Sequence, residues 1–261
     1  MRLFFLILLV FTQNIYAEDV FDKATILFND GHEESGFITA FLEDTKRSGS
    51  LEKLLDLDDK SFKFKINESG GVKEIFTENV KQVSVFYSDG SSNVYEVVRL
   101  RDLDKAGKPL EEEVLVYLIP VKKGKVNIYG IKYHEVRMGT GERAYTKYYL
   151  GGKDYFFYYQ NTKDSYAINY FNVGFGSIFK LKERMLAPLR NMCSDCKPAL
   201  DYIESNINPS NIDKKAIKAN DKILKKEFKS LPEEKQLDLK TLHYYECFEL
   251  NELINMYETC N

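Results

Sequence analysis

Alternation of apolar and polar residues with a period of two runs through the first two-thirds of this chain and constrains its fold more than any other feature. In SFKFKINESGGVKEIF, Phe62, Phe64 and Ile66 fall on one side and the lysines between them on the other. This is the pattern of a half-buried strand. The chain also holds 18 Tyr and 18 Phe, residue types that pack well across neighbouring strands. The sequence therefore predicts successive strands from Ala24 to about Phe171.

Short turns separate the predicted strands. Asp30-Gly31 and Asp89-Gly90 supply the positive backbone angle that a tight hairpin needs, and Val83 and Val85 alternate just before the second of these turns. Gly151-Gly152 gives a further hairpin signal between two aromatic strands. The stretch EEVLVYLIPV is more continuously apolar, which predicts a strand covered on both faces. Antiparallel strands joined by short turns favour a curled sheet or a partly open barrel.

The C-terminal third has a different period. Apolar residues recur at helical spacing in FKLKERMLAPLRNM, in the basic stretch DKKAIKANDKILKKEF and in LKTLHYYECFELNELINMY. Ser194 or Asp195 is a suitable N-cap for a helix whose first turn contains Pro198. The predicted fold class is α+β, with an antiparallel β-rich domain over residues 18–175 and a helical C-terminal region over residues 176–261.

The N-terminus, MRLFFLILLVFTQNIYAEDV, is typical of a secretory signal. Arg2 precedes the apolar run Leu3–Phe11, and Ala17 is a small residue before the charged Glu18. A membrane helix needs about 20 apolar residues, so this run is too short to span a bilayer and fits a cleavable signal. A buried N-terminal strand is the weaker alternative. We expect residues 1–17 to be a signal peptide, the mature protein to be exported to the periplasm or cell surface, and no transmembrane span to remain in it.

The charge of the chain is mild. Loss of the first 17 residues removes one arginine and no acidic residue, so the formal net charge changes from −3 to −4. Such a balance argues neither for nucleic acid nor for an anionic membrane surface as a partner. The chain has no Trp, which weakens a sugar-binding interpretation. The charges of the helical third are interpreted as a solvated face.

All four cysteines, Cys193, Cys196, Cys247 and Cys260, lie in the helical third. The first two are spaced C-x-x-C, and the last two belong to a single predicted helix that starts near Leu239. An even count in an exported protein favours structural disulfides, and three pairings are open. A bond between the C-x-x-C segment and the last helix would clamp that helix and contribute about 3–4 kcal/mol.

Two other uses of the cysteines stay open. His243 precedes Cys247 by four residues, on the same helical face, and with the C-x-x-C pair would complete a Cys3His zinc set. Export to an oxidising compartment works against this set. A thioredoxin-like redox site needs C-x-x-C beside a βαβ unit, whereas the preceding strands are predicted to be antiparallel.

No residue of the sequence is assigned a catalytic, cofactor-binding or metal-ligating role, and no cofactor is expected. His32-Glu33 and His134-Glu135 are not followed by the second histidine of the zinc-protease helix. Asp56–Lys60 lacks the rest of a calcium-binding loop, and VGFGSIF is not followed by a phosphate-loop lysine.

Several segments occur in a recognisable order after the signal-like N-terminus: ILFNDGHEESGFI, FKFKINESGGVKEIFTENVKQVSVF, FFYYQN, SDCKPALDYI and the ending LINMYETCN. In this plan the chain resembles a diffuse family of exported proteins of unknown function, common in Bacteroidota-type Gram-negative bacteria. The resemblance touches most of the mature chain and implies a periplasmic or surface-associated setting. That family has no established activity, so no catalytic residue is carried over. This chain departs from the family pattern by having both Cys193 and Cys196, and by an added helical stretch around residues 210–240.

The sequence therefore favours an exported, non-enzymatic binding or interaction module whose partner is unknown and would belong to the cell envelope. The alternatives are an envelope enzyme whose site is assembled from distant residues, an outer-membrane barrel, and a thiol-disulfide or zinc function at the C-x-x-C pair. A deep pocket with converging polar groups would favour the enzyme, and a filled core would favour the interaction module.

Overall fold

The computed structural model describes residues 21–39, 60–88, 90–104, 106–132, 137–138, 147–148, 155–168, 186–208, 210–211 and 214–260. Within these residues the main feature is one continuous sheet of ten strands, ordered β12-β11-β8-β7-β6-β5-β1-β2-β3-β4. Its strands are β1 (Phe21–Phe28), β2 (Glu33–Thr39), β3 (Ser61–Lys65), β4 (Lys73–Phe76), β5 (Val80–Phe86), β6 (Ser92–Leu103), β7 (Pro109–Lys122), β8 (Val126–Lys132), β11 (Tyr155–Asn161) and β12 (Ala167–Ile168). The pair β9 (Arg137–Met138) and β10 (Lys147–Tyr148) stands apart from it.

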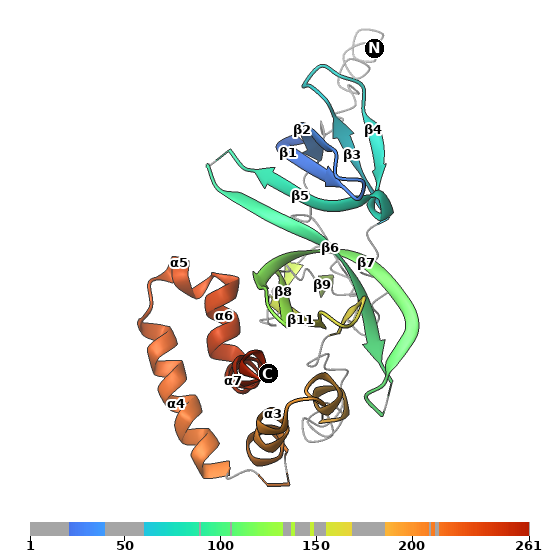
Figure 1. The fold of residues 1–261 in the computed structure, drawn as a ribbon. Helices are drawn as coiled ribbons and strands as arrows, with labels where there is room; N and C mark the ends of the chain where they lie inside the picture. Colours follow the sequence, from blue (N-terminus) through green and yellow to red (C-terminus); the bar gives the residue numbers. More distant parts are fainter. Residues whose placement is uncertain are drawn as a thin grey trace, which may run out of the picture.

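The first five strands form a curled sheet around a core of its own, at the top of Figure 1. β1 pairs with both β2 and β5, and a 3-10 helix, η2 (Thr77–Asn79), leads the chain from β4 into β5. The alternation predicts the core correctly at Phe64, Val83 and Val85, whose side chains are fully buried. It is wrong at Ile66, which lies beyond the end of β3 and is 64% exposed.

Two glycines are needed by this curled sheet. Gly31 closes the β1–β2 hairpin with a φ of 89°, as the Asp30-Gly31 pair predicts. At Gly36 on β2, a Cβ atom would lie 2.2 Å from the carbonyl oxygen of Lys65 and 2.5 Å from the Phe64 ring. The missing side chain therefore lets β3 and its buried ring lie directly against the β2 backbone.

β6 and β7 are the longest strands and connect the curled sheet to a second β unit (Figure 1). The first half of β6 pairs with β5, and the second half pairs with β7 and β12. On β7, Tyr117 points into the core of the curled sheet while Val116 and Leu118 belong to a different cluster. The Tyr117 hydroxyl donates to Oγ1 of Thr77 at 3.1 Å. The prediction of a strand covered on both faces is confirmed here.

The second unit is a closed barrel made of β6, β7, β8, β11 and β12. β12 is antiparallel to β11 and parallel to β6, where Ala167 lies opposite Leu100 and Ile168 opposite Arg101. Five strands cannot alternate in direction all the way round a ring, so one neighbouring pair must be parallel. The predicted α+β class agrees with this structure, but the expectation of a partly open barrel is wrong. Apolar side chains fill the interior: Val98, Leu100, Val114, Val116, Leu118, Tyr129, Ile131, Tyr158 and Ala167.

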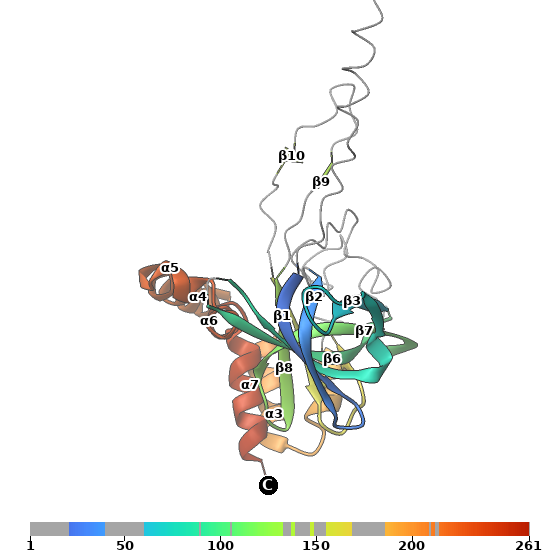
Figure 2. The same ribbon diagram turned by 90° about the horizontal axis from the view of Figure 1, so that it is seen from above.

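The C-terminal helices pack against the outer face of β8 and β11 (Figures 1 and 2). Alternate residues of these strands, such as Ile128 and Phe157, turn outward and share a core with Leu189, Leu253 and Ile254 of the helices. The helical segments are residues 186–192, α3 (Lys197–Tyr202), the π-helical turn η3 (Ile203–Ile207), α4 (Lys214–Ser230), α5 (Glu233–Gln236), α6 (Leu239–Glu246) and α7 (Phe248–Thr259). None of the helices within the described residues is long and apolar enough to cross a membrane.

Two helix boundaries differ from the sequence prediction. The single last helix is in fact two helices, α6 and α7, because the backbone of Cys247 breaks the repeat with φ −118° and ψ 37°. α3 begins after Cys196, not after Ser194 or Asp195, and no side chain caps it. Pro198 lies in its first turn, as predicted. The predicted signal peptide, the Gly151-Gly152 hairpin, His134 and residues 56–59 lie outside the described residues.

We predict that Phe64→Ala destabilises the protein by about 3–5 kcal/mol, because it empties a fully buried site in the curled sheet. Phe76→Ala is the matched control, since that ring is 52% exposed and its removal should change the free energy of unfolding by less than about 1 kcal/mol. Urea unfolding of both variants measures the difference. Equal losses in the two variants would show that the core of the curled sheet is wrongly assigned.

Candidate functional site

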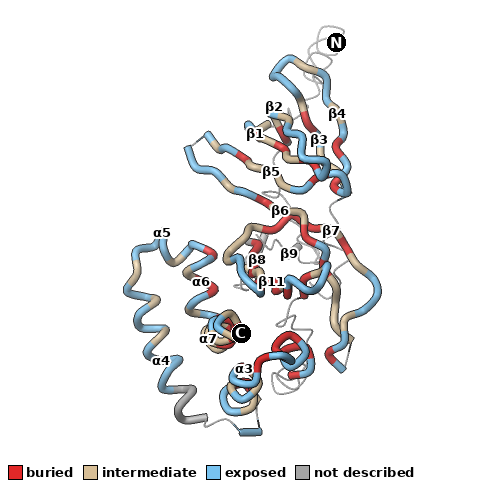
Figure 3. Tube along the Cα trace, viewed as in Figure 1, coloured by how far each residue is buried: buried red, intermediate tan, exposed pale blue. Residues whose placement is uncertain are grey.

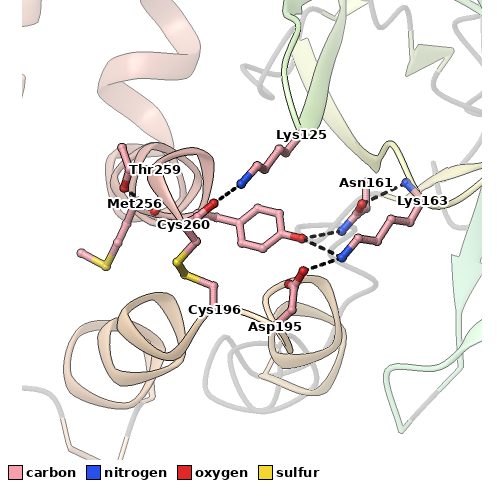
Figure 4. The surroundings of a disulfide bond; sticks show 9 residues. Lys125, Asn161, Lys163, Asp195, Cys196, Met256, Thr259 and Cys260 are labelled. Carbon is pink, nitrogen blue, oxygen red and sulfur yellow. Dashed lines mark hydrogen bonds and ion pairs between the residues drawn. A yellow bond between two sulfur atoms is a disulfide. The ribbon is translucent and has the colours of Figure 1, made fainter.

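The C-terminal helices are tied to one another by a disulfide between Cys196 and Cys260, with their Cα atoms 5.8 Å apart (Figure 4). Cys196 directly precedes α3 and Cys260 directly follows α7. The bond spans 64 positions of the sequence and so closes a loop around α3 to α7. In the chain-entropy treatment, closing a loop of this size stabilises the folded state by about 4 kcal/mol.

The structure contains one bond between the four cysteines, Cys196–Cys260, and none of the three complete pairings. This bond joins the C-x-x-C segment to the end of the last helix, as the clamp interpretation expects. Cys193 and Cys247, however, are buried thiols outside any disulfide. The expectation that all four cysteines are in disulfides is therefore corrected to one bond, Cys196–Cys260.

A redox role for the C-x-x-C pair gains no support from the geometry. Cys193 and Cys196 are not bonded to each other, and both are buried. Burial, reinforced by the charge of Asp195, raises the pKa of the Cys193 thiol to about 12. A reactive cysteine needs an exposed sulfur with a lowered pKa, and Cys193 has neither property.

The Cys3His zinc set is not assembled either. The sulfur of Cys196 is taken by the disulfide, and Nε2 of His243 lies 3.2 Å from the hydroxyl of Tyr159. The histidine ring also packs nearly perpendicular to the Phe157 ring, with ring centroids 5.0 Å apart. Across the described part of the chain, no group of three or more His, Cys, Asp and Glu side chains is placed to hold a metal ion.

A polar network surrounds the disulfide and fixes the barrel to the helices. Asn161, at the end of β11, is buried, and its Nδ2 donates to the carbonyl of Met192 at 3.1 Å. Two residues on, the Lys163 ammonium donates to the Asp195 carboxylate at 2.6 Å and to the Tyr257 hydroxyl at 3.4 Å. The bond from Lys163 holds the pKa of the Asp195 carboxyl below its usual value. We call these five residues the disulfide junction, and Figure 4 shows Asn161, Lys163 and Asp195 of this set beside the disulfide.

The turn between β7 and β8 is hydrogen-bonded to the end of α7. The Glu258 carboxylate accepts hydrogen bonds from the backbone N–H groups of Lys125 and Val126, at 3.0 and 3.3 Å. The Lys125 ammonium donates to the carbonyl of Cys260. A Cβ atom at Gly124 would lie 2.1 Å from Oε1 of Glu258, so the glycine leaves room for the carboxylate. Sequence analysis missed these contacts, because Gly124 and Glu258 are 134 positions apart and carry no motif.

Two hollows lie beside these contacts. One, of about 280 Å³, adjoins the disulfide junction and is lined in part by Asn161, Lys163 and Tyr166. The first two already make the hydrogen bonds described above, and the Tyr166 ring is covered by the Arg101 guanidinium at 4.4 Å. These three side chains therefore make contacts within the protein.

The second hollow, of about 290 Å³, lies over His243 between β7 and α6 and is lined mainly by apolar surface, including Val121 and Tyr244. Burial, with the positive charge of Lys122 nearby, lowers the pKa of His243 to about 4. The imidazole is therefore neutral near pH 7 and serves as the buried hydrogen-bond partner of Tyr159. The other described histidine, His32, is exposed and stacks on the Phe28 ring at 4.1 Å.

No protein-family model, no curated protein and no solved structure matches this chain. The resemblance to exported Bacteroidota-type proteins therefore stays a prediction, and function has to be argued from the geometry of the chain itself.

We predict that His243 makes the protein less stable in acid. Its folded-state pKa of about 4 lies below the ordinary 6.5, so the unfolded chain binds a proton between these values that the folded chain does not. Stability contributed by the neutral ring is thus complete above pH 6.5 and is lost as the pH falls toward 4. Between pH 7 and pH 5 the loss should be about 2 kcal/mol.

Urea unfolding at the two pH values measures this loss. His243→Gln should flatten the pH dependence, whereas the control His32→Gln, at an exposed histidine, should leave it in place. An unchanged pH dependence in His243→Gln would contradict the assignment of a buried neutral ring.

Proposed function

We propose that this protein is an exported, non-enzymatic interaction module of the cell envelope. The observation that carries the proposal is the Cys196–Cys260 disulfide, which closes the helical part of the fold. Disulfides form and persist in oxidising compartments outside the cytoplasm. The signal-like residues 1–17 support the same setting. This support is independent of the disulfide, because the signal-like pattern is recognised without any reference to the cysteines.

The arrangement of the polar groups supports an interaction module over an enzyme. Catalytic acids and bases work best with a pKa near the operating pH. The two most strongly shifted groups among the described nucleophiles and bases are Cys193, whose pKa is about 12, and His243, whose pKa is about 4. Both pKa values lie far from neutral pH, so neither group is suited to exchange protons there. In the described residues, the barrel interior is occupied by a cluster of buried apolar side chains, as in small barrels whose side chains fill the interior.

The exposed parts of the curled sheet suit contact with another molecule. Among the described residues, β4 is the terminal strand of the ten-stranded order, so one of its edges meets no other described strand. Three exposed apolar side chains lie on or beside the β3–β4 hairpin: Ile66, Val72 and Phe76. An open strand edge with apolar residues beside it is a common feature of surfaces that bind partners.

The test is to express the full-length gene in a Gram-negative host and to map the exported protein by mass spectrometry without reduction. We expect an N-terminus at Glu18, a linked peptide containing Cys196 and Cys260, and thiols at Cys193 and Cys247. As a control, Leu6→Arg with Leu8→Arg should disrupt the apolar run and keep the chain inside the cell, with its N-terminus unprocessed.

An exported protein that still carries residues 1–17 would defeat the signal-peptide claim. An exported protein in which Cys196 and Cys260 are reduced would remove the main support for the envelope setting.

A further inference from the structure

α4 concentrates positive charge in a way that the rest of the chain does not. Seven of its 17 residues are lysine and two, Asp221 and Glu227, are acidic, so the helix carries a formal charge of +5. The whole chain carries −3. Lys222, Lys225 and Lys226, together with Lys229, have exposed side chains. We call these four residues the lysine face of α4.

The spacing of these four residues puts them on one side of the helix. They stand at positions i, i+3, i+4 and i+7, which share an arc of about 100° at 3.6 residues per turn and extend over about 10 Å. Glu227, the acidic residue within this stretch, falls on the opposite side by the same repeat. The lysine face is therefore an unbroken row of ammonium groups.

The lysine face points away from the protein. On the other side of α4, the half-buried Leu224 and Phe228 turn toward α6, and the Phe228 ring lies 5.5 Å from the Tyr245 ring. Figures 1 and 2 place α4 at the outer margin of the molecule, and Figure 3 shows most of its described length as exposed. The helix is thus anchored by its apolar side and presents its lysines to the surroundings.

These lysines are not neutralised by the protein. Within the described residues, no ion pair or hydrogen bond joins any of the four to a carboxylate, whereas Lys73, Lys123 and Lys163 each pair with an acidic side chain. Like charges at helical spacings of three and four repel one another and weaken the helix. An anionic partner along the row would relieve this repulsion.

We propose that the lysine face of α4 docks the protein on the surface of a bilayer that contains anionic lipid. Clusters of four to eight basic residues on an amphipathic helix are attracted to such surfaces, each by a modest amount. A straight row on a peripheral helix can meet a plane of phosphates along its whole length. Docking on a membrane deepens the proposed interaction function, on which it rests for the setting in the cell envelope.

The chemistry of the row favours lipid phosphates over nucleic acid. α4 contains no arginine, the residue type that most often reads guanine bidentately, and its one aromatic residue, Phe228, faces α6 and cannot stack on a base. Lysine is a compact point charge that suits loosely ordered phosphates. Leu224 and Phe228 are half-buried against the neighbouring helices, and Ile223 is the one large apolar side chain that the described part of α4 exposes, at 56%. A single exposed side chain adds little to four ammonium groups, so binding is mainly by charge and must weaken with salt.

The test is co-sedimentation of the full chain with vesicles of phosphatidylcholine alone or with about one-third phosphatidylglycerol. The neutral vesicles measure any binding through the apolar residues 3–11. Lys222, Lys225, Lys226 and Lys229 are changed together to Gln, which keeps a good helix former at each position. The matched control changes four exposed lysines elsewhere to Gln, with the same loss of charge: Lys23, Lys81, Lys108 and Lys197.

We expect the natural chain to bind the anionic vesicles in preference to the neutral ones, and the α4 variant to bind them roughly 100-fold more weakly. The control variant should lose less than about 5-fold, and raising the salt should release the natural chain. Circular dichroism and thermal melting check that both variants stay folded.

Equal binding of the natural chain to both vesicles, or equal losses in the two variants, would overturn the proposal. Lysine-dependent binding to duplex DNA without binding to vesicles would also overturn it and assign the row to nucleic acid. Vesicle binding is measured on purified protein and does not depend on export, so it fails independently of the N-terminal and disulfide mapping above.

Discussion

The parallel pairing of β12 with β6 is the contact on which the barrel, and the helices packed against it, depend. It closes the five-stranded barrel, yet β12 is only two residues long, so its own hydrogen bonds provide little stability. Ala167 is held in the barrel interior and Ile168 in the core beneath the helices. Just before β12, the Tyr166 ring lies under the guanidinium of Arg101 on the facing strand. Closure of the barrel thus places Ile168 in the same apolar core as the helices, and we expect the packed helices to stabilise it.

Besides the apolar core that they share with β8 and β11, the helices are held by polar contacts at one end of these strands. Asn161 and Lys163 join the end of β11 to the helical segments, and Glu258 joins the end of α7 to the β7–β8 turn. The disulfide joins the start of α3 to the end of α7 beside these hydrogen bonds (Figure 4). Oxidation of two cysteines therefore completes a fold whose first half has a core of its own.

The sequence predicts the strands well because burial on one face imposes a period of two. Val83 and Phe64 follow this period inside strands, whereas Ile66 fails because β3 ends one residue before it. Closure of the barrel could not be predicted, since a two-residue strand such as β12 has no period to detect. The break at Cys247 was also hidden, because α6 and α7 keep apolar residues in register across it.

The candidate sites were less predictable than the strands. The four cysteines were found as residues, but their pairing depends on which sulfurs the docked helices bring together, and spacing alone leaves three choices. Asn161 carries no motif and becomes important only because its amide is buried opposite the Met192 carbonyl. The lysines of α4 can be read from the sequence, but the net charge of the whole chain, −3, gives no sign of this local excess of positive charge.

The central claim is that the docked helices hold the barrel closed, and hydrogen exchange measured by mass spectrometry with and without reduction tests it most directly. Reduction of Cys196–Cys260 should speed exchange in α3, in α7 and in residues 155–168, while β1 to β5 keep their protection. The double variant Cys196→Ser with Cys260→Ser should give the same pattern without a reductant. Unchanged exchange in residues 155–168, or an equal loss of protection across the curled sheet, would contradict the account.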